Sequence, residues 1–218
     1  MNLDKLKNVG WTTKGEQMKS YLNIAAGKIY PIDFKDDGKN LLVQLDKMYW
    51  SINPPDAIEQ NHEKWLKELP VQNITHTNVD AFEFLGNYKY QFDNIACYRF
   101  LEHITKPDVQ GFIYLLSTSL KMGGTLDIIV PNYETLADII LNETIHKETT
   151  HEDWERHDTL LTYELLNEPS MPHASIWTPQ RINYFFKLEE RFEVESLNPN
   201  YAFDGRDIYI RAILKRIK

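Results

Sequence analysis

The fold is decided by the stretch Phe92-Asp93-Asn94-Ile95-Ala96-Cys97-Tyr98-Arg99-Phe100-Leu101-Glu102-His103-Ile104. Residues 92–98 are largely apolar and β-prone, which predicts a buried strand. The chain then leaves the sheet at the polar pair Glu102-His103, and a helix is expected to begin near Pro107, because proline suits the first helical position. Ligands of open α/β sheets bind just beyond the carboxyl ends of the strands. This stretch therefore predicts a central strand with a functional site at its end.

The sequence on either side of this strand alternates between strand and helix patterns. Upstream, it predicts strands over residues 21–24, 41–45 and 71–78, a helix over 56–69 and a helical turn over 81–85. Downstream, it predicts helices over 107–121, 133–145, 151–166 and 178–190, and strands over 126–130, 192–197 and 208–214. Gly123-Gly124 is expected to end the first of these helices, and Thr178-Pro179 to begin the last. The pattern predicts an α/β fold with a doubly wound, mostly parallel sheet and an antiparallel edge hairpin.

The composition is typical of one globular domain. The chain has 218 residues, of which 42% are hydrophobic and 26% are charged. The net charge of −8 disfavours nonspecific binding to nucleic acid, so no nucleic-acid partner is expected. The single cysteine, Cys97, fits a reducing compartment. The first 20 residues do not resemble a signal peptide and no long apolar run follows, so a cytoplasmic protein without membrane contact is expected.

Three consecutive predicted strands end in small or acidic residues: Ala25-Ala26-Gly27, Asp46 and Asp80. Small residues let a ligand approach the backbone closely. An acidic residue at the end of the second strand can accept hydrogen bonds from two ribose hydroxyls, and one at the end of the third can meet an adenine amino group. Together these strand ends predict an adenosine-containing ligand. Each aspartate taken singly is equally typical of ordinary turn chemistry.

The order of these motifs resembles that of class I S-adenosylmethionine-dependent methyltransferases, in particular the small-molecule branch with a Leu-Glu-His segment. The matching pieces are Leu22-Asn23-Ile24-Ala25-Ala26-Gly27, Val43-Gln44-Leu45-Asp46, Asn78-Val79-Asp80-Ala81, Phe92-Asp93-Asn94-Ile95, Leu101-Glu102-His103-Ile104, Leu120-Lys121-Met122-Gly123-Gly124-Thr125-Leu126 and Val130-Pro131-Asn132. The resemblance implies a seven-stranded, Rossmann-like sheet of order 3-2-1-4-5-7-6. It also implies S-adenosyl-L-methionine as the cofactor, S-adenosyl-L-homocysteine as the product, and a small-molecule or glycan acceptor.

The resemblance also implies which residues contact the cofactor. They are Ala25, Ala26, Gly27, Asp46, Lys47, Met48, Asp80, Ala81 and Tyr98. One of them departs from the family pattern, because Ala25 stands where the family has its first glycine. If the backbone there needs a positive φ, alanine is disfavoured by about 1–2 kcal/mol. Ala25 therefore keeps open a methyltransferase-like domain that binds a partner and has lost catalysis. A nucleoside-cofactor oxidoreductase is a weaker alternative, because this loop offers a single glycine for a diphosphate.

His103 is the candidate catalytic residue. An imidazole titrates near neutral pH, so His103 can act as a general base, although methyl transfer to an atom that is already nucleophilic needs none. A structural role for Glu102 and His103 in holding the loop is the alternative. Some relatives bind a divalent metal through a Glu-x-x-Glu-His cluster. The first position of that cluster is Arg99 here, which repels a cation, so no metal is expected.

Residues 133–177 are longer than a crossover to the next strand requires, because the helix over 178–190 already supplies one. Long insertions of this kind serve as lids or binding surfaces. We expect them to cover the acceptor site and to contact substrate through Tyr133 and His173, the latter placed by the resemblance near the mouth of the site. A dimer contact or a solvated helical decoration is the alternative. We expect a single domain over residues 1–218, with residues 1–19 as an arm, and leave the oligomeric state open.

Overall fold

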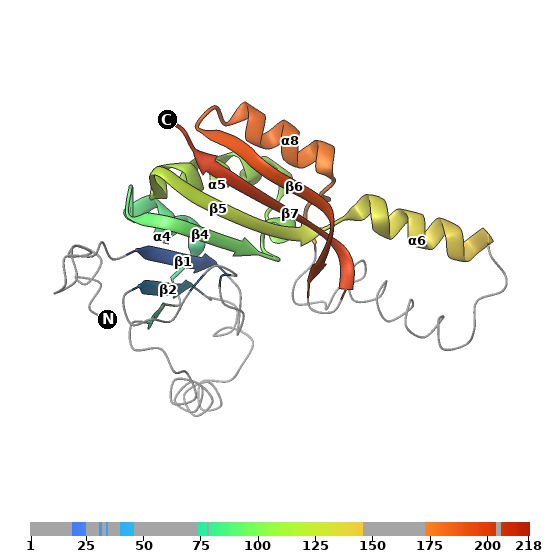
Figure 1. Ribbon diagram of the computed structural model, residues 1–218, viewed down its shortest axis with the longest axis horizontal. Coiled ribbons are helices and arrows are strands. Elements are labelled where there is room, and N and C mark those ends of the chain that lie inside the picture. The colour runs from blue at the N-terminus through green and yellow to red at the C-terminus, as the bar shows by residue number, and fades with distance from the viewer. Residues whose placement is uncertain are drawn as a thin grey trace, which may run out of the picture.

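The computed structural model describes residues 19–24, 31, 34, 40–45, 74–77, 79–145, 173–203 and 206–218. These residues form one sheet of seven strands in the order β3-β2-β1-β4-β5-β7-β6 (Figure 1). The strands are β1 Ser20–Ile24, β2 Leu41–Leu45, β3 Ile74–Thr77, β4 Phe92–Tyr98, β5 Leu120–Pro131, β6 Phe192–Phe203 and β7 Arg206–Arg216. The helices are α4 Ala81–Asn87, η1 Leu101–His103, α5 Lys106–Ser119, α6 Tyr133–Ile145 and α8 Pro179–Leu188. The predicted strand order is confirmed.

The strand directions also agree with the sequence pattern. Strands β1 to β5 pair in parallel, with β1 between β2 and β4, and β7 is antiparallel to both β5 and β6. The predicted edge hairpin is longer than expected: β6 continues to Phe203 and β7 begins at Arg206. Register shifts around Asn198 and Tyr201 accommodate the turn-forming residues of β6 within the strand. The predicted connection of about ten residues is therefore mostly strand.

The predicted end of the helix over 107–121 is wrong. Helix α5 ends at Ser119, and Gly123 and Gly124 lie within β5. Gly123 has a φ of +76°, and a Cβ on Gly124 would lie 2.9 Å from the carbonyl oxygen of Asp93. The glycines therefore allow β5 to bend closely past β4 at the register shift between Phe92 and Asn94. A pair of glycines can end a helix or allow a strand to bend. The local sequence does not distinguish these two cases.

Alternating side chains of the central strands build a core on each face of the sheet. Ile95 and Cys97 of β4 belong to the larger core, together with buried residues of α4, α5 and α8. Ala96 and Tyr98 belong to the smaller core, together with Leu136 of α6. This period of two is the one expected for a strand buried on both faces. Cys97 is buried and its thiol is free.

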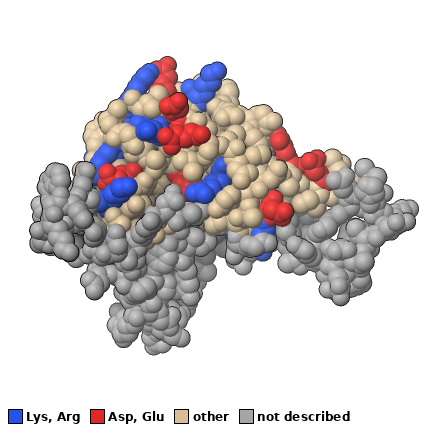
Figure 2. All heavy atoms as spheres, viewed as in Figure 1, with Lys and Arg blue, Asp and Glu red and all other residues tan. Residues whose placement is uncertain are grey.

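Helix α6 leaves the end of β5 and extends away from the sheet (Figure 1). Its bounds, Tyr133–Ile145, match the prediction, whereas the helices predicted over 56–69 and 151–166 lie outside the described residues. Helix α8 begins as predicted, because the Thr178 side chain accepts a hydrogen bond from the amide of Arg181. On the surface turned toward the viewer in Figure 2, basic and acidic side chains are interspersed. Among the described helices, none has both the length and the apolar character needed to cross a membrane.

Candidate functional site

The site begins where the chain leaves β4. Arg99 has a φ of 52°, in the left-handed region that few residues other than glycine adopt, and its amide donates to the carbonyl of Ile129 on β5. This sharp turn leads directly into η1, which contains Glu102 and His103. The side chain of Glu102 is 0% exposed, and His103 is half-buried. A strained turn therefore places a buried carboxylate and an imidazole at the carboxyl end of the central strand.

A segment far away in the sequence is fixed against this turn. The amides of Ala174 and Ser175 both donate to the carbonyl of Glu102, at 2.7 and 2.9 Å. The Ser175 hydroxyl donates to the carbonyl of Leu101 at 2.9 Å and accepts from the indole Nε1 of Trp177 at 3.0 Å. Trp177 is fully buried, so its N–H needs such an acceptor. These bonds hold residues 173–177 beside η1.

The two predicted substrate residues, Tyr133 and His173, meet at this point. The Tyr133 hydroxyl and Nδ1 of His173 are 2.5 Å apart. The rings of His173 and His103 have centroids 5.1 Å apart and cross at 64°. The amide of Tyr133 also donates to the carbonyl of Trp177 at 3.1 Å, which ties the start of α6 to the same segment. The structure therefore brings together the predicted catalytic residue and both predicted substrate residues.

Glu102 completes the cluster. A carboxylate oxygen of Glu102 and one ring nitrogen each from His103 and His173 all lie within 4.8 Å of one another. Below them, burial raises the pKa of the Cys97 thiol well above its ordinary value, and the negative charge of Glu102 raises it further. Cys97 therefore stays protonated and offers no nucleophile, since thiolates are the reactive form. The acid–base groups of this cluster are Glu102, His103 and His173.

The predicted cofactor residues are only partly described. Ala25, Ala26, Gly27, Asp46, Lys47 and Met48 lie outside the described residues. Asp80 caps α4, because its side chain accepts from the amides of Phe82 and Glu83 at 3.0 and 3.5 Å. Ala81, the first residue of that helix, is buried. Asp80 and Ala81 thus lie between β3 and α4; the cap is the ordinary turn chemistry open to this aspartate, and their contact with a cofactor stays a prediction.

The side chain of Tyr98 is buried in the sheet and bonds to the neighbouring strand β5. It is 1% exposed, and its hydroxyl donates to Asp127 at 2.7 Å. Asp127 also forms two bonds with Arg211 of β7, at 3.0 and 2.8 Å. The Tyr98 side chain is therefore engaged inside the sheet, and the cofactor contact expected near Tyr98 stays a prediction. The Tyr98–Asp127–Arg211 network was missed from the sequence, which carries no local signal of a contact between residues so far apart along the chain.

Comparison with known proteins gives a fold but no close relative. No family model matches the sequence, and no curated protein matches it. A SAM-dependent methyltransferase from Methanosarcina mazei superimposes with a TM-score of 0.60 and 15% identity over 93% of this chain and 94% of that one. The 1,6-didemethyltoxoflavin-N1-methyltransferase of Burkholderia thailandensis, with bound S-adenosylhomocysteine, gives a TM-score of 0.57 and 10% identity over 91% of this chain and 71% of that one.

A third similar structure is the N-methyltransferase NodS from Bradyrhizobium japonicum, with a TM-score of 0.53 and 14% identity over 92% of this chain and 86% of that one. At such low identity the comparisons establish the architecture. Together with the strand order and the reversed last strand, they show that this chain has the Rossmann-like fold of the class I S-adenosylmethionine-dependent methyltransferases.

Proposed function

We propose that this protein is an S-adenosylmethionine-dependent methyltransferase that acts on a small molecule or a glycan. The observation that carries the proposal is the sheet order β3-β2-β1-β4-β5-β7-β6, with the acid–base cluster at the carboxyl end of β4. In open α/β sheets this edge is where ligands bind. Asp80, which caps α4 at the end of β3, supports an adenosine site at the same edge of the sheet.

The reaction requires little from the protein beyond alignment. The acceptor atom gives an electron pair to the methyl carbon, the bond between that carbon and sulfur breaks, and its electron pair remains on sulfur. The sulfonium becomes the neutral thioether of S-adenosylhomocysteine. Holding the two reactants in line supplies much of the rate enhancement. His103 is proposed as the catalytic residue on the acceptor side, with Tyr133 and His173 contacting the acceptor.

The experiment that tests this function is calorimetric titration with S-adenosylmethionine and S-adenosylhomocysteine. The wild-type chain is expected to bind both. Asp46→Ala is expected to bind S-adenosylmethionine about 10–150-fold more weakly, because a charged hydrogen-bond acceptor contributes about 1.5–3 kcal/mol. Incubation with metabolite extracts and mass spectrometry then identifies the methylated product. If the wild type binds neither compound, the proposal is contradicted. That result would favour the alternative that Ala25 keeps open, a methyltransferase-like domain that binds a partner and has lost catalysis.

The role of His103 has its own test. His103→Ala is expected to lower turnover by about 10²–10⁴-fold, the range for losing a group that handles the acceptor's proton. Affinity for S-adenosylmethionine is expected to stay the same, since the His103 ring lies against His173, which is predicted to contact the acceptor. Turnover within a few-fold of the wild-type value would return His103 to a structural role.

A further inference from the structure

Glu102, His103 and His173 form a set of donor atoms that no local stretch of the sequence contains. The donors are a carboxylate oxygen and two imidazole nitrogens, all within 4.8 Å of one another. A metal held tetrahedrally about 2.0–2.2 Å from each ligand atom requires these atoms to lie about 3.3–3.6 Å apart, so each donor atom must shift by about 1 Å or less. From this arrangement we infer that the cluster binds a divalent first-row transition metal.

The surroundings of the cluster hold two of the three ligands in place before any metal binds. The Glu102 carbonyl accepts the amides of Ala174 and Ser175, so the turn that carries Glu102 and the segment that carries His173 are joined directly. The bond between Ser175 and the carbonyl of Leu101 adds a third link. A site whose backbone is fixed in this way loses little conformational freedom on metal binding.

Metal-binding histidines usually form a hydrogen bond through the ring nitrogen that does not bind the metal, and Tyr133 provides this partner for His173. Its hydroxyl lies 2.5 Å from Nδ1 of His173. When Nδ1 carries the proton and donates it to that hydroxyl, Nε2 is left as the ligand atom. Partners of this kind fix the tautomer and the orientation of a metal-binding histidine, and their loss typically costs 10–100-fold in affinity. Tyr133 is therefore a positioning residue for the metal.

The expectation of no metal was based on Arg99, which occupies the first position of the family's acidic cluster. In the structure His173 supplies a third donor from a different part of the chain. The guanidinium carbon of Arg99 lies 5.9 Å from the centre of the Tyr209 ring on β7, where it forms a cation–π contact. With one carboxylate and two imidazoles, the set favours zinc, cobalt or manganese over magnesium and calcium, which prefer oxygen ligands.

The chemical role of the metal rests on the proposed function. A hydroxyl group of the acceptor bound to the metal has a lowered pKa and loses its proton to solvent. The resulting oxygen then attacks the methyl carbon of S-adenosylmethionine, and the electron pair of the broken carbon–sulfur bond stays on sulfur. The acceptor class is therefore a compound with a hydroxyl group. With the metal bound, His103 acts on the acceptor's proton through the metal and not as a free base, and His103→Ala is expected to lower turnover in either case.

Metal binding is tested on the full chain without any assay of activity. The protein is stripped with a chelator, titrated with Zn²⁺ by calorimetry, and loaded with Co²⁺ for absorption spectroscopy. We expect one equivalent of Zn²⁺ and visible absorption bands from Co²⁺ bound to imidazole and carboxylate. Glu102→Gln and His173→Gln are expected to weaken binding at least 10-fold, and Tyr133→Phe 10–100-fold. Thermal melting of each stripped variant shows whether the fold is retained.

Two controls make the result decisive. Glu190→Gln makes the same change at a side chain that is 81% exposed and near the carboxyl terminus, and it is expected to bind Zn²⁺ as the wild type does. In a second control, His146, His151 and His157 are all replaced by Gln. This variant is expected to bind Zn²⁺ as the wild type does, which excludes those histidines as the ligands. Absence of Zn²⁺ binding to the wild type, or equal binding by wild type, Glu102→Gln and His173→Gln, would overturn the inference. Zinc binding by a protein that fails to bind S-adenosylmethionine would leave the metal site standing and overturn the proposed function.

Discussion

Asp127 is the residue whose side chain connects the three neighbouring strands β4, β5 and β7. It accepts one hydrogen bond from Tyr98 of β4 and two from Arg211 of β7. The side chains of Arg211 and Asp127 are 17% and 15% exposed, so water screens this ion pair little. The hydrogen bond to Asp127 raises the pKa of Arg211. The guanidinium of Arg211 therefore remains charged across the physiological pH range.

Replacing Asp127 by alanine leaves the Arg211 guanidinium and the Tyr98 hydroxyl without this acceptor. We expect the free energy of unfolding to fall by about 3 kcal/mol, the lower end of the range for breaking a buried ion pair. Urea denaturation measures the change. Glu195→Ala is the control, because it breaks an exposed ion pair: the side chains of Lys215 and Glu195 are 46% and 42% exposed. For this variant the free energy of unfolding is expected to fall by less than about 1 kcal/mol. Equal losses in the two variants would contradict this account.

At the scale of elements, Asp93 joins the amino-terminal ends of three strands. It accepts from the Ser20 amide and hydroxyl of β1, both at 2.8 Å, and from Lys121 of β5 at 2.7 Å. Burial is the largest single effect and raises the pKa of Asp93. The hydrogen bonds from Lys121 and Ser20 together outweigh it, so that the pKa is lowered from 3.8. The stability that Asp93 contributes is therefore present above the unfolded-state pKa and is lost as the pH falls through the lower, folded-state value.

The expected measurement is the difference in unfolding free energy between the wild type and Asp93→Asn as a function of pH. At pH 7 the variant should be less stable by about 1.5–3 kcal/mol, the contribution of hydrogen bonds to a charged group. Below about pH 3.8 the difference should shrink, because the Asp93 carboxylate of the unfolded wild type takes up a proton at a higher pH than that of the folded protein. A difference that is constant from pH 7 to pH 3 would show that the charge of Asp93 is not what stabilises these strand ends.

The glycines of α5 and β5 give a matched pair of substitutions. A Cβ at Gly124 would lie 2.9 Å from the carbonyl oxygens of Asp93 and Lys121, whereas a Cβ at Gly111 in α5 would meet nothing within 4 Å. Gly124→Ala should destabilise the fold by about 1–3 kcal/mol through strain. Gly111→Ala should stabilise it by about 0.5–1 kcal/mol, since alanine is the better helix former. Thermal melting of both variants checks the signs, and a stabilising Gly124→Ala would contradict the close approach of β4 and β5.

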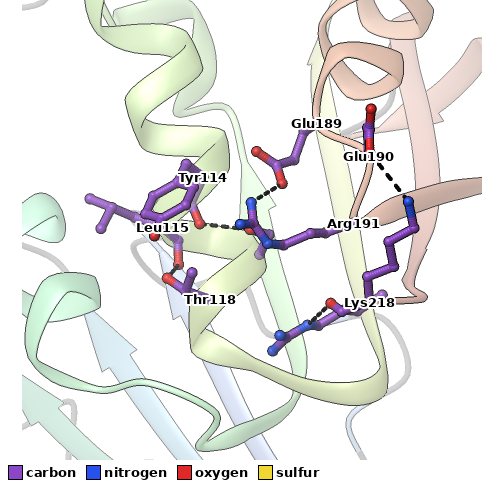
Figure 3. A network of polar contacts seen from close by, with 9 residues as sticks. Tyr114, Leu115, Thr118, Glu189, Glu190, Arg191 and Lys218 are labelled. Carbon is purple, nitrogen blue, oxygen red and sulfur yellow. Dashed lines mark hydrogen bonds and ion pairs between the residues drawn. The ribbon is translucent and has the colours of Figure 1, made fainter.

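A second network fixes the far end of the sheet, around the carboxyl terminus. Arg191 pairs with Glu189 at 2.5 Å, and its guanidinium carbon lies 4.9 Å from the ring centre of Tyr114 on α5 (Figure 3). Lys218 pairs with Glu190 at 3.3 Å nearby. These contacts join α5, the turn between α8 and β6, and the end of the chain. The site lies at the opposite end of the strands, so this network supports the sheet without touching the site.

At the scale of the whole molecule, α6 and residues 173–177 connect the smaller core to the site. Leu136 of α6 belongs to that core, and Tyr133 at the start of the helix contacts His173. We propose that residues 133–177 cover the acceptor site. Hydrogen exchange of residues 133–145 should then slow when S-adenosylhomocysteine is added, and should not depend on protein concentration. Protection that grows with protein concentration would identify an interface between copies of the chain instead.

The sequence by itself determined most of the described helices and strands. Runs of apolar, β-prone residues marked β4 at Phe92–Tyr98 and β2 at Leu41–Leu45, and Thr178-Pro179 marked the start of α8. These signals are local, because a strand or a helix start depends on neighbours within a few residues. The strand order came from the resemblance in the order of motifs.

Only the tertiary structure decided which side chains meet. Glu102 and His103 were visible as a pair, but His173 reaches them through hydrogen bonds between backbone segments about 70 residues apart. Asp127 and Arg211 are brought together by the pairing of β5 with β7, and Gly124 proved to be a strand residue because β4 passes beside it. Contacts of this kind depend on how elements pack after the chain has folded back on itself, and a pattern confined to neighbouring residues carries no record of them.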